Sequence, residues 1–358
     1  MLIWLLQRIV HVADSATLLT VRTALASLSA FLIALCLGPW AIHWLKGRFR
    51  ERIASDSARL DALHAAKKDT PTMGGIFILG AVCLAILLWG DLQSRYVQIG
   101  ILTALGLGGL GAVDDWIKLS TKKKGLSIRQ KLAGQFTVAL AASILLYLEN
   151  QAKPGGLDLV LPLRLGVIPL GVGFIAWSTL VVVGSSNGVN LTDGLDGLAS
   201  GCMIFAGTAF TALTYLAGNR VMAEFLRIPH LAGAGELTVL MGAVVGAVLG
   251  FLWFNAYPAQ VFMGDTGALP LGGLIGLAAL VSRQELLLLV VGGVFVAETV
   301  SVIAQVISFR GFGKRVLACA PLHNHFVFRG VHEVKIVVRF WIVAALLAIA
   351  GVASLRLM

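Results

Sequence analysis

The sequence NGVNLTDGLDGLA, residues 187–199, lies between two long apolar runs and contains two asparagines, two aspartates and three glycines. Carboxylates and amides at the edge of a membrane lose hydration, so they persist where they face one another, a metal ion or a polar substrate. Glycine has no side chain to clash with a phosphate and turns the backbone freely. The segment is therefore predicted to be a loop that forms the floor of a polar site.

The composition on either side of this segment is that of a membrane protein. The chain of 358 residues is 58% hydrophobic and only 13% charged, whereas soluble domains are about 25% charged. Apolar runs recur throughout and leave no gap for a soluble domain, which predicts one all-α integral membrane domain over residues 1–358. Residues 1–17 start apolar but lack a basic leader and a cleavage site, so they are predicted to be an interfacial segment.

A membrane-spanning helix needs about 20 mostly apolar residues, and ten runs meet this requirement. They are residues 20–44, 73–90, 96–113, 131–148, 167–184, 197–217, 237–254, 267–281, 286–308 and 335–355. The shortest is 267–281. The chain is therefore predicted to be a polytopic bundle of about ten transmembrane helices, and its glycine-rich spans are compatible with close packing and with a homodimer.

The distribution of lysine and arginine predicts which way the bundle faces. The first, third and ninth loops hold seven, six and four of these residues, whereas no even-numbered loop holds more than two. The positive-inside rule then makes the odd loops cytoplasmic and, with ten spans, both termini periplasmic. In so apolar a chain, the net charge of +10 indicates cytoplasmic loops and anionic headgroups and not a nucleic-acid partner.

The polar clusters lie in these odd loops or at the helix ends beside them, and we expect an active site there. The loops are 45–72, 114–131, 185–197, 255–267 and 309–334. The first cluster, Asp114–Asp115, is either a solvated helix end or a pair that recruits a cation, because adjacent like charges repel. Lys118, one turn further on, would neutralise the pair or reach a phosphate.

Aspartates in two other loops also have two interpretations. Asp193 and Asp196 are three residues apart, so they share one face if a helix starts there, although either Asp193 or Thr192 could instead be only an N-cap. Asp265 lies between glycines and is either a ligand or a turn residue. Phe262 is either loop packing or a surface on which a nucleobase stacks.

The remaining polar candidates are near the C-terminal end. His323 and His325 flank Asn324 in PLHNHF, which makes a poor zinc site, and they are either an interfacial pair or phosphate ligands. Glu298 and Gln305 lie two turns apart on one helix face and either line the site or tie helices together. Carboxylates, amides, lysines and histidines on one membrane face suit metal-dependent phosphoryl transfer, and magnesium prefers such oxygen ligands.

Six motifs together resemble one family. In order they are KKDTPTMGG, GAVDDWIK, NGVNLTDGLDGLA, WFNAYPAQVFMGDTG, ETVSVIAQ and PLHNHF, running from Lys67 toward the C-terminus. They resemble bacterial phospho-N-acetylmuramoyl-pentapeptide transferases, within the polyprenyl-phosphate N-acetylhexosamine-1-phosphate transferase superfamily. The resemblance implies a multi-pass inner-membrane enzyme with a cytoplasmic active site that uses Mg²⁺. It would transfer phospho-MurNAc-pentapeptide from UDP-MurNAc-pentapeptide to undecaprenyl phosphate, forming lipid I and UMP for peptidoglycan synthesis, and so serve cell-wall biogenesis, cell shape and cell division.

The resemblance also implies roles for residues that match the motifs. Asp114, Asp115 and Asp265 would be catalytic, with Asp114 and Asp115 near the lipid phosphate, and Asp265 and Asp193 would be metal ligands. The substrate-binding residues would be Lys67, Lys131, Asn190, Asp193, Asp196, Asn255, Phe262, Gln305, His323, Asn324 and His325.

The chain departs from the family pattern at three positions. Asn324 replaces the middle histidine of the usual PxHHHxE, Val327 replaces its acidic residue, and Asp69 replaces a glycine of KxGTPTMGG. An amide still donates to phosphate but carries no charge. Two other functions stay open: a sister transferase acting on UDP-GlcNAc, and a secondary transporter, which would place acidic residues near mid-membrane in several spans.

Overall fold

The computed structural model describes residues 15–47, 70–121, 125–162 and 165–357. Of the predicted interfacial segment 1–17, only residues 15–17 are described, and they begin the first long helix. Lys67 and most of the loop 45–72 lie outside the described residues.

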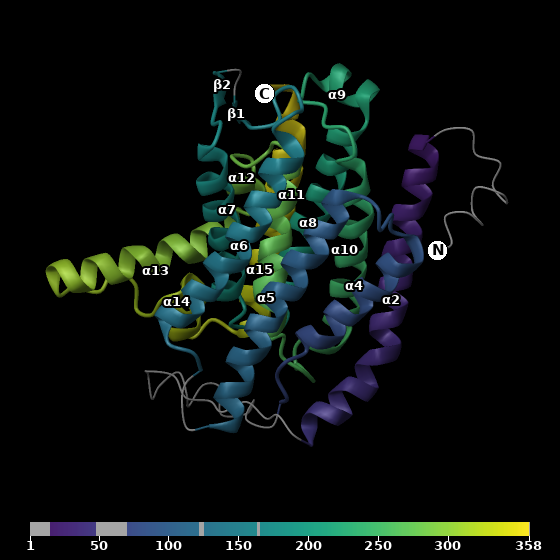
Figure 1. The fold of residues 1–358 in the computed structure, drawn as a ribbon. Helices are drawn as coiled ribbons and strands as arrows, with labels where there is room; N and C mark the ends of the chain where they lie inside the picture. The colour runs from purple at the N-terminus through teal and green to yellow at the C-terminus, as the bar shows by residue number, and fades with distance from the viewer. Residues whose placement is uncertain (1–14, 48–69, 122–124, 163–164, 358) are drawn as a thin grey trace.

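Long helices packed side by side make up the bundle (Figure 1). They are α2 (Ser15–Lys46), α4 (Gly75–Trp89), α5 (Arg95–Ser120), α6 (Ile128–Asn150), α7 (Gly173–Thr192), α8 (Leu198–Gly218), α10 (Gly235–Asn255), α11 (Asp265–Ser282), α13 (Gly293–Phe312) and α15 (Glu333–Ala353). Shorter elements are α9 (Arg220–Leu226), α12 (Leu288–Val291), α14 (Leu322–Phe328) and the 3₁₀ turn η3 (Ser354–Leu357).

The prediction of a polytopic helical membrane protein is confirmed. Within the described residues, nine helices are long and apolar enough to cross a membrane, and the tenth apolar helix, α4, is shorter at 15 residues. The helix within the predicted span 73–90, and not the helix within 267–281, is therefore the shortest of these ten. Gly74 directly precedes α4, and Gly90 directly follows it in an extended conformation.

Helix α11 is the centre of the bundle. All of its 18 residues are buried, and it packs against α5, α7 and α8. A helix that is apolar on every side can bury itself only by being surrounded. Because Asp265 is its first residue, this central helix fixes the position of the aspartate against three neighbours.

Glycines allow α5 and α11 to come into backbone contact near the aspartates. A Cβ added to Gly111 of α5 would lie 2.2 Å from the carbonyl oxygen of Asp265, whereas one added to Gly109 would meet nothing within 4 Å. Small residues at helix contacts are a general feature of packing in lipid.

We expect Gly111→Ala to destabilise the protein by about 1–3 kcal/mol, because overpacking must push α5 away from α11. Thermal unfolding of the purified protein in detergent would measure the change. Gly109→Ala, two residues away on the exposed side of the same helix, is the matched control and should melt like wild type. Equal melting of the two variants would contradict this contact.

One connector contains a β-hairpin that the sequence did not predict. Strand β1 (Asp158–Leu161) pairs antiparallel with β2 (Gly166–Pro169), with Asp158 opposite Pro169. The predicted span 167–184 therefore begins too early, and the helix starts at Gly173. Gly171 adopts φ of +51°, a turn conformation that glycine favours. The hairpin lies on the same face of the bundle as α9 and the C-terminus (Figure 1).

The predicted span 286–308 is also divided in two. The four-residue helix α12 ends at Val291, Gly292 follows as its C-cap, and α13 begins at Gly293. Two consecutive glycines weaken a helix. The residues on both sides of them are apolar, so the sequence pattern did not indicate the break. Figure 1 shows α13 leaving the bundle sideways, so side chains such as Ile303, Ile307 and Phe312 remain exposed where membrane lipid would cover them.

Candidate active site

The ends of four helices bring the central polar residues together. Asp114 and Asp115 lie near the C-terminal end of α5, Lys131 near the start of α6, Asn190 near the end of α7, and Asp265 at the start of α11. The sequence predicted all five as site residues, and the structure joins them into one cluster.

Asp265 accepts hydrogen bonds from two lysines and one amide. Its Oδ2 accepts hydrogen bonds from Lys118 Nζ at 2.8 Å and Lys131 Nζ at 2.6 Å, and its Oδ1 accepts from the amide of Asn190. Lys131 also lies 3.4 Å from Asn190 Oδ1. Charge-assisted hydrogen bonds of this kind are stronger than neutral ones, so they hold a buried carboxylate in its ionised form.

Asp114 lies beside Asp265 and shares its lysines. Its Oδ2 is 2.7 Å from Lys118 Nζ and 4.0 Å from Lys131 Nζ, and its Oδ1 accepts the backbone N–H of Leu126 at 2.7 Å. Leu126, just before α6, therefore lies beside Asp114, and this carboxylate contacts both the cluster and the backbone that leads into α6.

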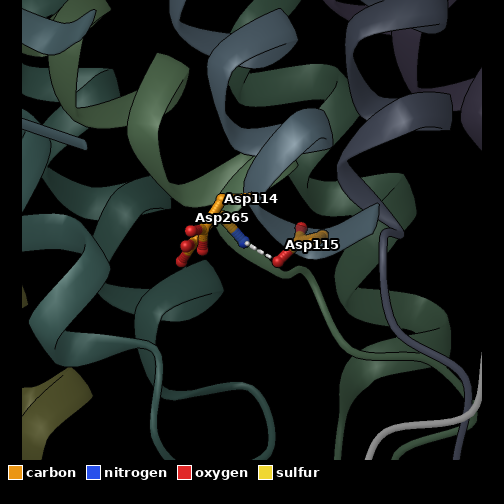
Figure 2. Close-up of side chains that lie close together, drawn as sticks. All are labelled: Asp114, Asp115 and Asp265. Carbon is orange, nitrogen blue, oxygen red and sulfur yellow. Dashed lines mark hydrogen bonds between the residues drawn. The ribbon is translucent and has the colours of Figure 1, made fainter. Parts of the chain in front are cut away.

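Asp115 holds the beginning of α11. Its oxygens accept the backbone N–H of Asp265 at 3.3 Å, drawn in Figure 2, the backbone N–H of Thr266 at 2.9 Å and the Thr266 hydroxyl at 2.8 Å. The first N–H groups of a helix have no partner within it, and Asp115 supplies one from another helix. Gly264 precedes α11 with φ of +70°, which favours glycine there.

Three carboxylates form the one candidate metal cluster found among the described residues. One oxygen each from Asp114, Asp115 and Asp265 lies within 4.8 Å of the other two, and all three residues are buried. Hard oxygen ligands of this kind are those that Mg²⁺ takes in proteins. The donor set therefore fits a divalent cation by its chemistry.

Asp193, the other predicted metal ligand, is not a member of this group. The segment 187–192 is helical and not a loop as predicted, because α7 continues to Thr192. Asn190 is consequently the residue of this segment that reaches Asp265, and the half-buried Asp193 follows at the end of the helix. A role for Asp193 in metal binding stays a prediction. The N-cap interpretation of Asp193 and Thr192 is wrong, since Gly197 precedes α8 and no side chain caps it.

Asn255 and Asp196 form hydrogen bonds within the protein. Asn255 accepts hydrogen bonds from Gly197 N at 3.1 Å and Ser200 Oγ at 2.8 Å, and donates to the carbonyl of Val261 at 2.9 Å. Asp196 accepts the backbone N–H of Ala259 at 2.9 Å. Both side chains therefore connect the start of α8 to the loop after α10.

Phe262 and Gln305, predicted on the nucleotide side, also have local partners. The half-buried Phe262 exchanges backbone hydrogen bonds with Pro71 and Gly74. Gln305 on α13 accepts the backbone N–H groups of Val316 and Leu317 at 3.1 and 2.9 Å. These contacts fix the local backbone beside each residue, and contact of either residue with a nucleotide stays a prediction.

The segment 321–325 packs against α13. His323 and Asn324 are buried, and Glu298 of α13 accepts the backbone N–H of His323 at 3.1 Å. His325 accepts the backbone N–H of Ala318 through Nδ1 at 3.1 Å. Glu298 therefore ties α13 to α14 and Gln305 ties α13 to the loop that follows it, and a place for either residue in lining the site stays a prediction.

Two residues that hold the candidate site together were not predicted from the sequence. Thr266 directly follows Asp265 and binds Asp115, and its place after the aspartate in GDTG was the available signal. Glu333, at the start of α15, accepts the backbone N–H of Asp196 at 2.9 Å, and only the fold brings these two residues together.

An apolar groove of about 300 Å³ runs between α7 and the α12–α13 segment. Trp177, Leu180 and Gly184 line it from α7, and Val296 and Val300 from α13. Apolar clefts with few polar groups are usual ligand sites.

Comparison with known families assigns the chain to a family. Residues 97–283, about half of the chain, match the model described as glycosyl transferase family 4, and this range contains every member of the Asp114, Asp115 and Asp265 cluster. Residues 67–79 match signature 1 of the phospho-N-acetylmuramoyl-pentapeptide-transferases, the family that the six motifs resemble. The chain therefore belongs to glycosyl transferase family 4 and is a phosphoglycosyl transferase of the phospho-N-acetylmuramoyl-pentapeptide-transferase type.

Proposed function

We propose that the protein transfers phospho-MurNAc-pentapeptide from UDP-MurNAc-pentapeptide to undecaprenyl phosphate, releasing UMP and forming lipid I on the cytoplasmic side of a bacterial inner membrane. The observation that carries the proposal is the Asp265 carboxylate, held by two lysines within a buried group of three carboxylates. Lysines and hard oxygen ligands together suit a diphosphate.

Mg²⁺ bound by Asp265, Asp114 and Asp115 would neutralise negative charge on the diphosphate. Lys118 and Lys131 already contact Asp265 Oδ2, so either ammonium group can reach a phosphate oxygen placed beside that carboxylate. Positioning and charge neutralisation carry most of the catalysis in phosphoryl transfer.

The reaction we propose is a single displacement. An oxygen of the lipid phosphate attacks the β-phosphorus of the UDP-sugar, the bond from that phosphorus to the bridging oxygen breaks, and UMP leaves with the bridging oxygen. Asp114 accepts the proton of the lipid phosphate. The competing mechanism is a covalent phospho-aspartate intermediate, which would require two displacements.

A stereochemical experiment separates these mechanisms. With a UDP-MurNAc-pentapeptide that is chiral at the β-phosphorus, we expect inversion of configuration in the lipid product, because one in-line displacement inverts. Phosphorus NMR of the product, in which the oxygens on this phosphorus carry isotopic labels, would measure the configuration. Retention would show two displacements and would exclude the direct mechanism.

The groove between α7 and α13 supports a lipid substrate. It is lined almost entirely by apolar side chains, as a polyprenyl chain requires. We expect Gly184→Phe to raise the KM for polyprenyl phosphate about tenfold or more, because the ring would fill a groove that Gly184 leaves open. The KM for the UDP-sugar should stay within twofold of wild type.

Gly173→Phe is the matched control, since Gly173 is exposed at the start of α7, outside the groove, and a Cβ there meets nothing within 4 Å. Initial-rate kinetics with each substrate varied in turn would measure both effects. Identical KM values for the two variants would mean that the lipid does not bind in this groove.

The substrate assignment itself is tested by incubating the purified protein and Mg²⁺ with polyprenyl phosphate and either UDP-MurNAc-pentapeptide or UDP-GlcNAc. We expect UMP and a lipid-linked product from the first donor. Product from UDP-GlcNAc alone would assign the sister activity instead, and absence of UMP with both donors would overturn the proposal.

A further inference from the structure

Gln135 of α6 and Asn187 of α7 form a reciprocal pair of side-chain amides. The Gln135 nitrogen donates to Oδ1 of Asn187 at 3.3 Å, and the Asn187 nitrogen donates to Oε1 of Gln135 at 2.8 Å. Gln135 is fully buried, although most of α6 is not. Because hydrogen bonds between side chains tie helices together in lipid, this pair joins α6 to α7 at one defined height.

A backbone carbonyl fixes the orientation of both amides. The nitrogen of Asn187 also donates to the carbonyl oxygen of Val183 at 2.8 Å. A carbonyl accepts and cannot donate, so the nitrogen of Asn187, and not its oxygen, must face Val183. Gln135 must then present its oxygen to that nitrogen and its nitrogen to the oxygen of Asn187. An apolar side chain at position 135 would make neither contact, and a carboxylate would make only one.

The amide pair lies one helical turn from two residues that hold Asp265. Gln135 follows Lys131 by four residues on α6, and Asn187 precedes Asn190 by three on α7. Residues three or four apart share one face of a helix, so both amides lie on the faces that lead to the aspartate cluster. Lys131 Nζ is 2.6 Å from Asp265 Oδ2 and 3.4 Å from Asn190 Oδ1.

Helix α6 depends on its neighbours to place Lys131. Helix α7 packs directly against α11, which begins with Asp265, whereas α6 packs mainly against α7 and α5. The contact with α5 is apolar near the site, where a Cβ added to Gly134 would lie 2.6 Å from a methyl group of Leu110. Apolar contacts have no preferred direction. The amide pair does, so it determines the height of Lys131 along α7.

We propose that Gln135 is a positioning residue for the transfer reaction, whose pairing with Asn187 keeps Lys131 where its ammonium group meets Asp265 and a diphosphate oxygen placed beside it. This inference rests on the proposed function. Gln135 acts through Lys131 and does not itself contact the substrate. The lysine side chain is long and flexible, so a shift of α6 along α7 would remove the ammonium group from Asp265 without changing any residue of the cluster.

The first test measures the reactivity of Lys131 and needs no substrate. In Gln135→Leu, Lys131 should react with acetic anhydride about threefold faster than in wild type, because contact with the buried Asp265 carboxylate shields its amine from the reagent. Mass spectrometry of the peptide that contains Lys131 would measure the rate. Lys153, just beyond the opposite end of α6 and 2.7 Å from Glu149, is the internal control. An unchanged rate at Lys131, or equal acceleration at both lysines, would overturn the proposal.

The second test is kinetic and has a matched control on the same pair of helices. Gln135→Leu should lower kcat about tenfold, and Gln135→Asn, which keeps a shorter amide, should lower it less and serves if the first variant does not fold. Ser143 is buried two turns further along α6 and accepts a hydrogen bond from Thr179 of α7 at 3.2 Å. Ser143→Ala therefore also removes a contact between α6 and α7, but kcat should stay within twofold of wild type. Equal losses in the variants at 135 and 143 would overturn the proposal.

A double-mutant cycle tests whether Gln135 acts through Lys131. Lys131→Met removes the ammonium group, so adding Gln135→Leu to it should change single-turnover UMP release by less than about twofold. A general structural defect would lower the rate about tenfold in both backgrounds and would overturn the proposal. If the wild-type protein releases no UMP but the labelling result is as expected, the proposed function fails and the role of Gln135 in placing Lys131 stands.

Discussion

Asp265→Asn is expected to lower the rate of UMP release by on the order of 10³-fold, the size of effect seen when a preorganised electrostatic group is removed. The substitution keeps the shape and the capacity to accept a hydrogen bond but removes the negative charge that two lysines contact. Binding of a divalent cation should weaken as well, since one of three clustered carboxylates is lost. Single-turnover UMP release, and Mn²⁺ binding followed by electron paramagnetic resonance, would measure the two effects.

Asp91→Asn is a suitable control for Asp265→Asn. Asp91 lies between α4 and α5, at the opposite end of α5 from the aspartate cluster, and its side chain accepts a hydrogen bond from the neighbouring backbone N–H of Gln93. This variant should retain wild-type rates and Mn²⁺ affinity. An Asp265→Asn protein that is folded and releases UMP within threefold of wild type would mean that the active site lies elsewhere.

Asp115→Ala is expected to destabilise the folded protein by about 3 kcal/mol, because buried donors are left without an acceptor. The affected donors are the backbone N–H groups of Asp265 and Thr266 and the Thr266 hydroxyl. Removing the carboxylate also releases the start of α11, so activity should fall together with the melting temperature. Thermal unfolding in detergent, with UMP release measured well below the transition, would separate the two losses.

Thr266→Val provides the graded comparison for Asp115→Ala. It removes only the hydroxyl that binds Asp115, so we expect a loss of about 1 kcal/mol, the contribution of one hydrogen bond. If Asp115→Ala melts at the wild-type temperature but is inactive, then Asp115 acts directly in the chemistry and does not anchor α11 as we infer.

The sequence predicted the membrane architecture well because that signal is repeated. Each helix needs a run of apolar residues, and the basic residues gather in alternate loops, so one misjudged boundary changes little. The errors came where apolar letters continue across a change of structure, at the β-hairpin before Gly173 and at the break between Gly292 and Gly293. In both places glycine marks the change, but glycine is also frequent inside these helices.

The composition of the site was predictable, but its internal geometry was not. Adjacent carboxylates and polar loops identified Asp114, Asp115 and Asp265. The different partners of the first two, a loop backbone for Asp114 and a helix start for Asp115, depend on how α5 and α11 meet. The same holds for Asn255, whose amide reads as a binding group in the sequence but is used within the protein.

The burial of α11 has a consequence for biosynthesis. Asp115 and Asp265 are 150 residues apart in the chain, so Asp114, Asp115 and Lys118 are translated and inserted long before α11 emerges. Until then Asp265 is not available to pair with these residues, and α11 does not yet fill the space between α5, α7 and α8. A ribosome-stalled chain that ends before Asp265 should therefore be sensitive to membrane proteases, and a chain that extends past Ser282 should become resistant.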